Sequence, residues 1–359
     1  MKNFKKNYLT PGHPTAFAGI NKLVKYYKVP SNEIKRALES VEVYSTHYET
    51  KKPKRNPYYV WYRRQQFQID LVDIAENAWY NSGIKYLLTC IDVFSKKAWV
   101  EPLKSKRAQE TLDAFSRIVD RAGAPHTLIS DQGTEIKNIK FDAYLHERNI
   151  KQIFPQNEVH AAVVERFNKT LQVLIYKFLA SKEFSLVKTK NPKNKVRYLD
   201  DLQALVDSYN NSFHRTIKMT PEEADEPANH HLVQAAHQER YKKIEQVAAK
   251  RKRNYIKVGD GVRIKDNTRK FARAYDERFK DEIYIVKEIN TKMPYNRYIL
   301  RDITGQELWG TFYYEELVKV QDTGVYRVEK VLKRRKVGKR KEALVKWKGW
   351  DEKHNSWIT

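Results

Sequence analysis

The spacing of hydrophobic positions changes several times along the chain, and each spacing predicts a different kind of element. Between residues 15 and 48, apolar side chains recur at helical spacing on both sides of Pro30, which predicts two amphipathic helices. The two stripes consist of Phe17, Ile20, Leu23, Val24 and Tyr27, and of Ile34, Leu38, Val41, Tyr44 and Tyr48. This arm is interpreted either as a helix-turn-helix-like DNA-binding element or as a helical cap packed on its neighbour.

Short apolar runs and amphipathic stretches alternate through residues 66–182. The apolar runs predict strands at 66–74, 85–95, 97–103, 126–130 and 150–155. The amphipathic stretches predict helices at 105–123, 138–149 and 161–181. The first three strands are close enough in sequence to form an antiparallel meander, whereas helices join the later strands, as parallel crossovers require. The order predicts an α/β domain with a mixed sheet.

The flanking segments have other patterns. Residues 51–65 hold six basic residues, two prolines and no acid, which indicates an extended basic linker. A helical segment within 197–215 is followed by a connecting helix within 226–253. Short strands separated by Gly, Asp and Asn turns predict a small β-barrel over 254–320. Residues 322–359 predict a second β module with a densely basic hairpin.

The charge of the chain favours a protein that binds polyanions, and its cysteine content excludes some disulfide and zinc-binding classes. The 359 residues include 69 Lys and Arg against 44 Asp and Glu, and the net charge of +25 is typical of a polyanion-binding protein. With 41% hydrophobic residues, the chain has enough apolar side chains for packed cores. Cys90 is the single cysteine, which excludes an intramolecular disulfide and any zinc site that needs two Cys ligands. Without long apolar runs, we expect no signal peptide and no membrane partner.

Three acidic residues lie where neighbouring strands and a helix meet. Asp70 lies within the first strand of the mixed sheet, Asp131 follows the fourth strand, and Glu165 is in the first turns of the long helix. Carboxylates clustered away from water repel one another unless a cation joins them, and hard oxygen ligands suit Mg²⁺ or Mn²⁺. Two such ions would serve in-line phosphoryl displacement. Two nearby acids have other interpretations: Asp73 as a solvated strand-end acid, and Asp92 as a turn cap.

Residues 66–225 resemble the catalytic core of retroviral-type integrases and the related DDE transposases. The resemblance rests on FQID ending at Asp70, SDQG at Asp131, Asn157 with VVERFNK around Glu165, and Tyr209–Asn210, His214 and Pro221. It implies a ribonuclease-H-like fold in which Asp70, Asp131 and Glu165 are catalytic and hold two Mg²⁺ ions, with Mn²⁺ as a substitute. The predicted DNA contacts are Asn157, Arg166, Lys169 and Gln172. An intrahelical ion pair between Glu165 and Lys169 is the alternative for that lysine.

The two C-terminal modules carry resemblances of their own. Residues 254–320 resemble the SH3-like barrel that follows retroelement integrase cores, and residues 322–359 resemble a chromodomain. The chromodomain resemblance implies that Tyr326, Trp347 and Trp350 cage a methylated lysine of a histone tail by attraction of the cation to ring faces. The alternative is that these tryptophans are core residues, as we expect for Trp357. The chain ends at Thr359, before the family's terminal helix, so we expect a truncated chromodomain.

The helical arm of residues 1–50 and the series of domains look closest to integrases of Maverick/Polinton-like or retrotransposon-like eukaryotic elements. This resemblance implies a DDE-type polynucleotidyl transferase that processes 3′ ends and joins element-end DNA to target DNA. It also implies a homo-oligomer, a nuclear location and a methylated histone tail as a further partner. A domesticated, catalytically silent DNA- and chromatin-binding protein is the second hypothesis, and a ribonuclease H-type nuclease is the third. The interval of 33 residues between Asp131 and Glu165 is slightly shorter than is usual in the family.

Overall fold

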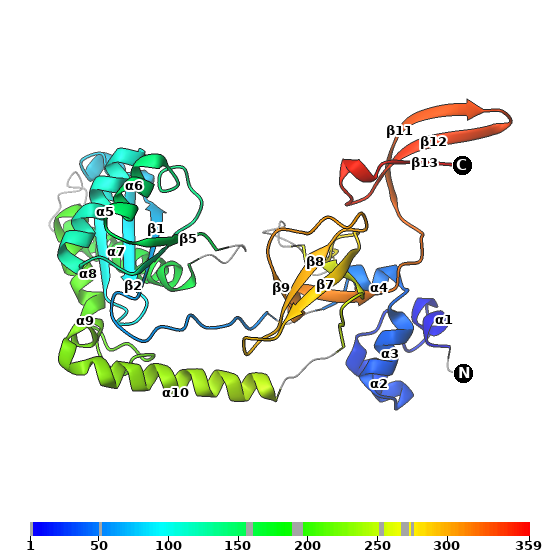
Figure 1. Ribbon diagram of the computed structural model, residues 1–359, viewed down its shortest axis with the longest axis horizontal. Helices are drawn as coiled ribbons and strands as arrows, with labels where there is room; N and C mark the ends of the chain where they lie inside the picture. Colours follow the sequence, from blue (N-terminus) through cyan, green and yellow to red (C-terminus); the bar gives the residue numbers. More distant parts are fainter. Residues whose placement is uncertain are drawn as a thin grey trace. The chain divides into compact units, whose positions relative to one another are not determined.

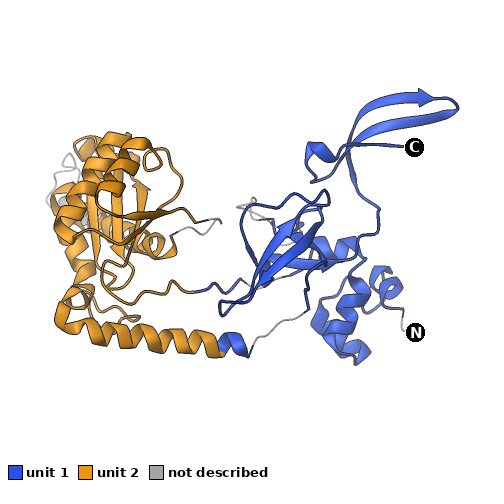
Figure 2. Ribbon diagram, viewed as in Figure 1, with its two compact units in different colours: residues 1–56, 247–359 blue, residues 57–246 orange. Residues whose placement is uncertain are grey.

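The computed structural model describes residues 3–49, 52–155, 161–188, 197–250, 255–266, 273 and 276–359. The chain divides into two compact units, one formed by residues 57–246 and the other by residues 1–56 together with 247–359 (Figure 2). Within the described ranges, no helix is both long and apolar enough to cross a membrane.

A five-stranded mixed sheet is the centre of the unit formed by residues 57–246 (Figure 1). Its strands are β1 (Gln66–Asp73), β2 (Tyr86–Asp92), β3 (Ala98–Leu103), β4 (Thr127–Ile129) and β5 (Lys151–Ile153), in the order β3-β2-β1-β4-β5. The pairs β1–β2 and β2–β3 are antiparallel, and β4 is parallel to both β1 and β5. The predicted meander and parallel crossovers are confirmed.

Helices cover both faces of this sheet: α5 (Ala108–Ala122) and α6 (Ile139–Glu147) lie on one face, and α7 (Ala162–Lys188) and α8 (Leu202–Asn210) lie on the other. The chain continues through α9 (Pro221–Asp225) and α10 (His230–Ala249), with short 3₁₀ turns at Ala75–Tyr80, Leu199–Asp201 and Pro227–Asn229. Successive side chains of β1 point to opposite faces. Phe67 and Ile69 therefore pack in the core with α5 and α6, whereas Val72 packs in the core with α7 and α8. Asp70 shares the α7 face with Val72.

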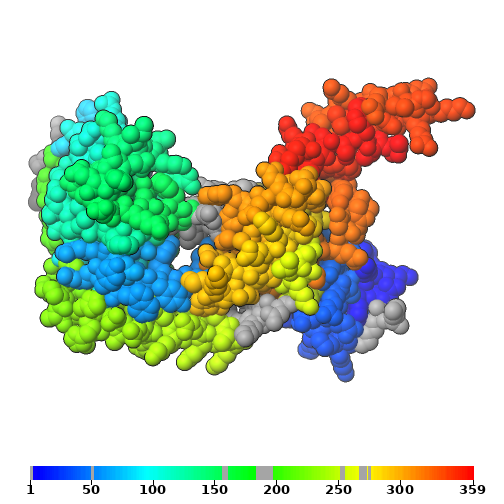
Figure 3. All heavy atoms as spheres, viewed as in Figure 1, coloured from blue at the N-terminus to red at the C-terminus, as the bar shows by residue number. Residues whose placement is uncertain are grey.

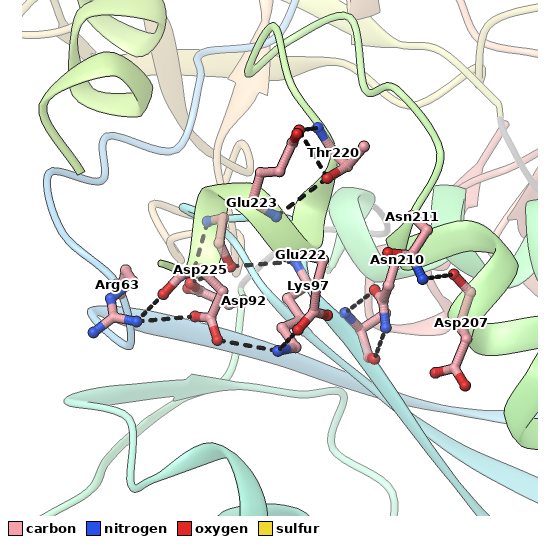
Figure 4. Close-up of polar contacts among 12 residues, drawn as sticks. Arg63, Asp92, Lys97, Asp207, Asn210, Asn211, Thr220, Glu222, Glu223 and Asp225 are labelled. Carbon is pink, nitrogen blue, oxygen red and sulfur yellow. Dashed lines mark hydrogen bonds and ion pairs between the residues drawn. The ribbon is translucent and has the colours of Figure 1, made fainter. Parts of the chain in front are cut away.

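Polar side chains fasten the segment after α8 to the start of β3 (Figure 4). The Asn210 side chain accepts a hydrogen bond from the Ala98 N–H and donates one to the Ala98 carbonyl, both at 2.9 Å. Lys97, directly before β3, forms ion pairs with two acids of α9, Glu222 at 2.8 Å and Asp225 at 3.3 Å. Asn210 therefore serves a structural function, which accounts for one polar position of the resemblance motif.

The second unit begins with four short helices: α1 (Phe4–Leu9), α2 (Ile20–Tyr27), α3 (Ser31–Leu38) and α4 (Glu42–Thr46). The prediction of two helices over 15–48 was wrong in number. Phe17 is exposed and has a positive φ of 49°, which helical residues do not adopt, so α2 begins only at Ile20. The second stripe divides between α3 and α4, because the chain leaves the helix after Leu38.

Two antiparallel sheets complete this unit, as the β pattern predicts. The barrel contains β6 (Gly261–Ile264), β7 (Tyr284–Asn290), β8 (Arg297–Arg301), β9 (Phe312–Tyr313), the 3₁₀ turn Tyr314–Glu316 and β10 (Leu317–Val320), in the order β10-β6-β7-β8-β9. The terminal module contains β11 (Val328–Val337), β12 (Arg340–Trp347), the 3₁₀ turn Glu352–His354 and β13 (Ser356–Ile358), in the order β11-β12-β13. The architecture is a ribonuclease-H-like mixed sheet followed by an SH3-like barrel and a chromodomain fold.

Candidate active site

Asp70 lies in β1 on the face covered by α7 and is largely buried. Its carboxylate accepts hydrogen bonds from the Leu71 N–H and from Asn168 Nδ2, each at 2.8 Å. Burial is the main reason that its pKa rises from 3.8 to about 6, and repulsion from Asp131 and Glu165 raises it further. Asp131 and Glu165 therefore both lie within electrostatic range of Asp70.

Asp131 follows β4 in an exposed loop. Its Oδ1 accepts a hydrogen bond from the Gly133 N–H at 3.2 Å, which closes a tight turn directly after the acid. The neighbouring Ser130 is fully buried, and its hydroxyl donates to the Asp131 carbonyl and accepts a hydrogen bond from Gln152 of β5. The loop backbone is thus tied to the sheet while the carboxylate of Asp131 stays accessible to solvent.

Glu165 lies in the first turn of α7, and Gln68 of β1 determines where that turn begins. The Gln68 side chain is fully buried, and its Oε1 accepts hydrogen bonds from the Val163 and Val164 N–H groups at 3.0 and 3.2 Å. The first N–H groups of a helix have no partner within the helix, so this side chain caps the amino terminus of α7 from a neighbouring strand. Gln68 therefore ties the amino terminus of α7, the helix that carries Glu165, to strand β1.

Asn168 is a site residue that the sequence analysis missed as a functional candidate. It is 7% exposed, its Nδ2 donates to Asp70, and its Oδ1 has no hydrogen-bond partner among the described residues. The signal in the sequence is its position three residues after Glu165, which places both on neighbouring turns of one helix face. A buried carbonyl oxygen without a donor, next to a carboxylate, is a further hard oxygen atom at this site.

These donors fit a divalent cation in chemical type. Carboxylate and amide oxygens are the ligands that Mg²⁺ takes, and a cation would relieve the repulsion that raises the pKa of Asp70. In the described part of the chain, however, no three His, Cys, Asp or Glu side chains are placed closely enough to hold a metal ion. In the structure, Asp131 and Glu165 therefore affect the pKa of Asp70, but the three carboxylates are not close enough together to coordinate one metal ion.

The exposed side of α7 carries most of the predicted DNA contacts. Arg166 and Lys169 are exposed, and Gln172 is half-buried. Glu165 and Lys169, both of them described, form no ion pair with each other, so the intrahelical alternative for Lys169 is not what the structure contains. The prediction for Asn157 falls outside the described residues.

The two rival acids have the structural positions that the sequence suggests. Asp73 is exposed at the end of β1 and accepts a hydrogen bond from the Ala75 N–H at 3.0 Å. Asp92 is buried and accepts hydrogen bonds from the Phe94 and Ser95 N–H groups and from the Ser95 hydroxyl. Asp92 therefore caps the turn between β2 and β3.

The three aromatic residues predicted to cage methyl-lysine do meet in the chromodomain fold. The Tyr326 ring lies edge-on to Trp350 and Trp347, with centroid separations of 4.9 and 5.7 Å. Trp350 is only 5% exposed, because it packs with the barrel residues Phe279, Ile283, Val318 and Val320. The core alternative therefore describes Trp350 well. For Trp357 the core prediction is wrong: its ring is 36% exposed, and the Arg335 guanidinium lies over it at 3.9 Å.

Comparison with known families agrees with this arrangement of domains. Residues 63–157 match the family model described as "Integrase core domain", which includes Asp70 and Asp131, and residues 326–359 match the Chromo (chromatin organisation modifier) domain. The chain carries an integrase core domain and a chromodomain. Glu165 lies beyond the matched segment of the integrase core.

The curated relatives of this chain are transposon proteins. A transposon-derived protein of Caenorhabditis elegans is 30% identical over 212 residues, which cover 59% of this chain and 65% of that protein. The retrovirus-related Pol polyprotein from transposon 297 of Drosophila melanogaster is 26% identical over 181 residues, 47% of this chain and 16% of the polyprotein. The chain thus spans less than two thirds of the length of either relative.

A solved structure supports the fold. The chain is similar to a chain of the simian T-cell lymphotropic virus intasome in complex with PP2A regulatory subunit B56 gamma, with a TM-score of 0.56 and 12% identity. The similarity covers 90% of this chain and 100% of that chain. At this identity the similarity establishes a common fold.

Proposed function

We propose that this chain is a metal-dependent DNA integrase, which processes the 3′ ends of element DNA and transfers them into target DNA. The observation that carries the proposal is the state of Asp70 within an integrase core domain. Burial and two neighbouring carboxylates raise its pKa to about 6, and such a cluster of acids costs stability unless it serves a cation.

In this proposal Asp70, Asp131 and Glu165 hold Mg²⁺, or Mn²⁺ in its place. Two bound metal ions would neutralise charge on the scissile phosphate and favour the deprotonated nucleophile, first water and then the 3′-hydroxyl. The chain's own groups prepare the site. Gln68 fixes the start of α7 and hence the position of Glu165, and the Asn168 amide orients the Asp70 carboxylate by its hydrogen bond.

The substrates are element-end DNA and target DNA, and the proposed place of action is the nucleus. The net charge of +25 and the exposed Arg166 and Lys169 support binding of a polyanion. A methylated histone tail is proposed as a further partner because Tyr326, Trp347 and Trp350 gather in one module, and a homo-oligomer is proposed from the similarity to integrases.

A second candidate function is DNA and chromatin binding without catalysis. The observation that favours it is the lack, among the described residues, of any three acidic, His or Cys side chains close enough to hold a metal ion. In that case the acids would be remnants of an ancestral site, and Mg²⁺ would change neither activity nor stability.

The deciding experiment is a strand-transfer assay with Mg²⁺, a duplex that carries the element's terminal sequence and a supercoiled target. We expect Asp70→Asn, Asp131→Asn and Glu165→Gln each to abolish both 3′ processing and strand transfer, because each removes a charge needed to bind the cation. Binding of the duplex should survive, since the basic surface is unchanged.

The matched control is Asp73→Asn, which removes the same charge from the solvent-exposed end of the same strand and should leave the rate within about twofold. Robust strand transfer by any of the three acid variants would remove that residue from the catalytic set. Failure of the native chain to act on its own element ends, with DNA binding intact, would favour the non-catalytic candidate.

A further inference from the structure

The ribbon formed by β11 and β12 carries an unusual run of uncompensated positive charge. Seven of its cationic side chains have no ion-pair partner in the described structure: Lys330, Lys333, Arg334, Lys336, Lys339, Arg340 and Lys341. Every residue from Val328 to Lys341 is exposed, so the distal ribbon is not packed into a core of the described residues. Figure 3 shows the side of this ribbon that is turned to the viewer. The charges are therefore available to a partner.

The strand register concentrates three of these charges on one face. Lys336 lies directly opposite Lys341, and Arg334 lies opposite Ala343, two residues along the same strand. Residues that pair directly, and residues two apart in a strand, share a face of the ribbon. Like charges placed directly opposite each other destabilise a hairpin, so this face is unfavourable until an anion occupies it.

On the opposite face and at the base of the ribbon, some of the cationic side chains form ion pairs. Arg335 forms an ion pair with Glu342 at 2.7 Å and stacks over the Trp357 ring. At the base of the ribbon, Lys346 pairs with Glu329 at 2.8 Å. These contacts brace the hairpin from one side, where Glu342 offsets part of the charge of Arg335 and of the unpaired Lys333 and Arg340. The side that holds Arg334, Lys336 and Lys341 carries no acid in this register, so its charge is not offset within the ribbon. The ribbon therefore has one basic face whose charged side chains form no ion pair with the described residues.

We propose that this face of the β11–β12 ribbon is a binding site for double-stranded DNA, with Arg334, Lys336 and Lys341 on backbone phosphates. The major groove of B-form DNA, about 12 Å wide, admits a two-stranded β-ribbon, whereas the major groove of A-form RNA is too narrow for side chains to read. A histone tail is itself basic and would be repelled by this face, which does not include the aromatic residues Tyr326, Trp347 and Trp350. The assignment deepens the proposed function, because it names a DNA contact in the chromodomain fold, outside the integrase core.

The test measures binding of a fluorescein-labelled duplex of mixed sequence to the full chain by anisotropy, in EDTA, across about 50–200 mM salt. The triple variant Arg334→Gln/Lys336→Gln/Lys341→Gln should lose about tenfold or more in affinity. Its plot of log affinity against log salt should be shallower by about 3, since each lost phosphate contact removes about 0.9 from the slope. All three positions are exposed, so near-ultraviolet circular dichroism should match the native chain.

The matched control is the triple variant Arg197→Gln/Lys243→Gln/Lys287→Gln, with the same change in net charge. Each of these side chains lies outside the ribbon and is already paired, with Asp200, Glu239 and Glu307 respectively, so it should contribute little to DNA binding. A charge-preserving variant, Lys336→Arg/Lys341→Arg, should bind as the native chain does.

Three outcomes would overturn the proposal: native affinity in the ribbon variant, equal losses in both triple variants, or a ribbon-dependent preference for a trimethyl-lysine histone peptide over the duplex. Because EDTA removes divalent metal ions, the result does not depend on catalysis. A chain that fails the strand-transfer assay can still confirm the ribbon, and an active integrase can still refute it.

Discussion

The carboxylate of Asp70 is destabilised by burial and by the charges of neighbouring acids. Folding raises its pKa from 3.8 to about 6, chiefly by burial, so the folded chain holds this proton more tightly than the unfolded chain does. The contribution of Asp70 to stability is therefore greatest below about pH 4, falls as the pH rises toward 6, and remains lowered above that value. A shift of about two pKa units corresponds to about 3 kcal/mol at neutral pH.

This cost predicts the behaviour of Asp70→Asn without metal. Since the variant has no charge to bury, it should unfold at a higher temperature than the native chain at pH 7.5, and the difference should vanish near pH 4. Mg²⁺ should raise the unfolding temperature of the native chain and not that of the variant. Thermal unfolding followed by circular dichroism across this pH range checks both, and a difference that did not change with pH would contradict the assignment.

At the scale of elements, side chains from one element complete the hydrogen bonding of another. Gln68 of β1 caps α7, and Asn210 at the end of α8 satisfies both backbone groups of Ala98 at the start of β3. Because such groups are buried, losing the partner leaves an unsatisfied donor or acceptor, which costs more than the bond itself contributes. These two contacts determine how α7 and α8 sit on the sheet.

Asn210→Ala should lower the free energy of unfolding of the integrase core by about 2 kcal/mol, since it leaves the Ala98 N–H and carbonyl without their partner. The neighbouring Asn211→Ala is the matched control: Asn211 is exposed and donates only to the Asp207 carbonyl, so its loss should cost well under about 1 kcal/mol (Figure 4). Urea denaturation measures both. Equal losses of unfolding free energy in the two variants would show that the hydrogen bonds between Asn210 and Ala98 contribute little to stability.

At the scale of the whole molecule, positive charge dominates. The net charge of +25 lies mostly outside the integrase core, whose residues 66–225 are nearly neutral, and it is densest in the linker of residues 51–65 and in the terminal module. Some of the linker's arginines are already paired, as Arg55 is with Glu316 and Arg63 with Asp225. A polyanion that contacts several of the free cations displaces its own counterions. Affinity for DNA of any sequence should then depend strongly on ionic strength.

We therefore expect the affinity of the full chain for a duplex of arbitrary sequence to fall by roughly a thousandfold or more between about 50 and 200 mM salt. Anisotropy titration at several salt concentrations measures the slope, and a duplex with the element's terminal sequence tests for added specificity. A nearly flat dependence would contradict an interface dominated by phosphate contacts.

The sequence by itself determined the succession of strands and helices in the core and the place of each acid within its element. Alternation of period two and of period 3.6 records which face of an element is apolar, so the five strands of the core and the helices between them could be predicted. Asp131 and Glu165 follow from the same pattern, because the end of a strand and the first turn of a helix are visible locally. The split of the amino-terminal arm into four helices was not predictable, since it depends on backbone turns such as the one at Phe17.

Only the tertiary structure decided which side chains complete one another. Gln68 and Asn168 are ordinary polar residues in the sequence, and they acquire a function because β1 packs against α7. Trp350 became core and Trp357 stayed exposed because the barrel covers one and not the other. The physical reason is the same in each case: local periodicity specifies the apolar face of an element, but hydrogen bonds and charge shifts depend on which faces of distant elements meet.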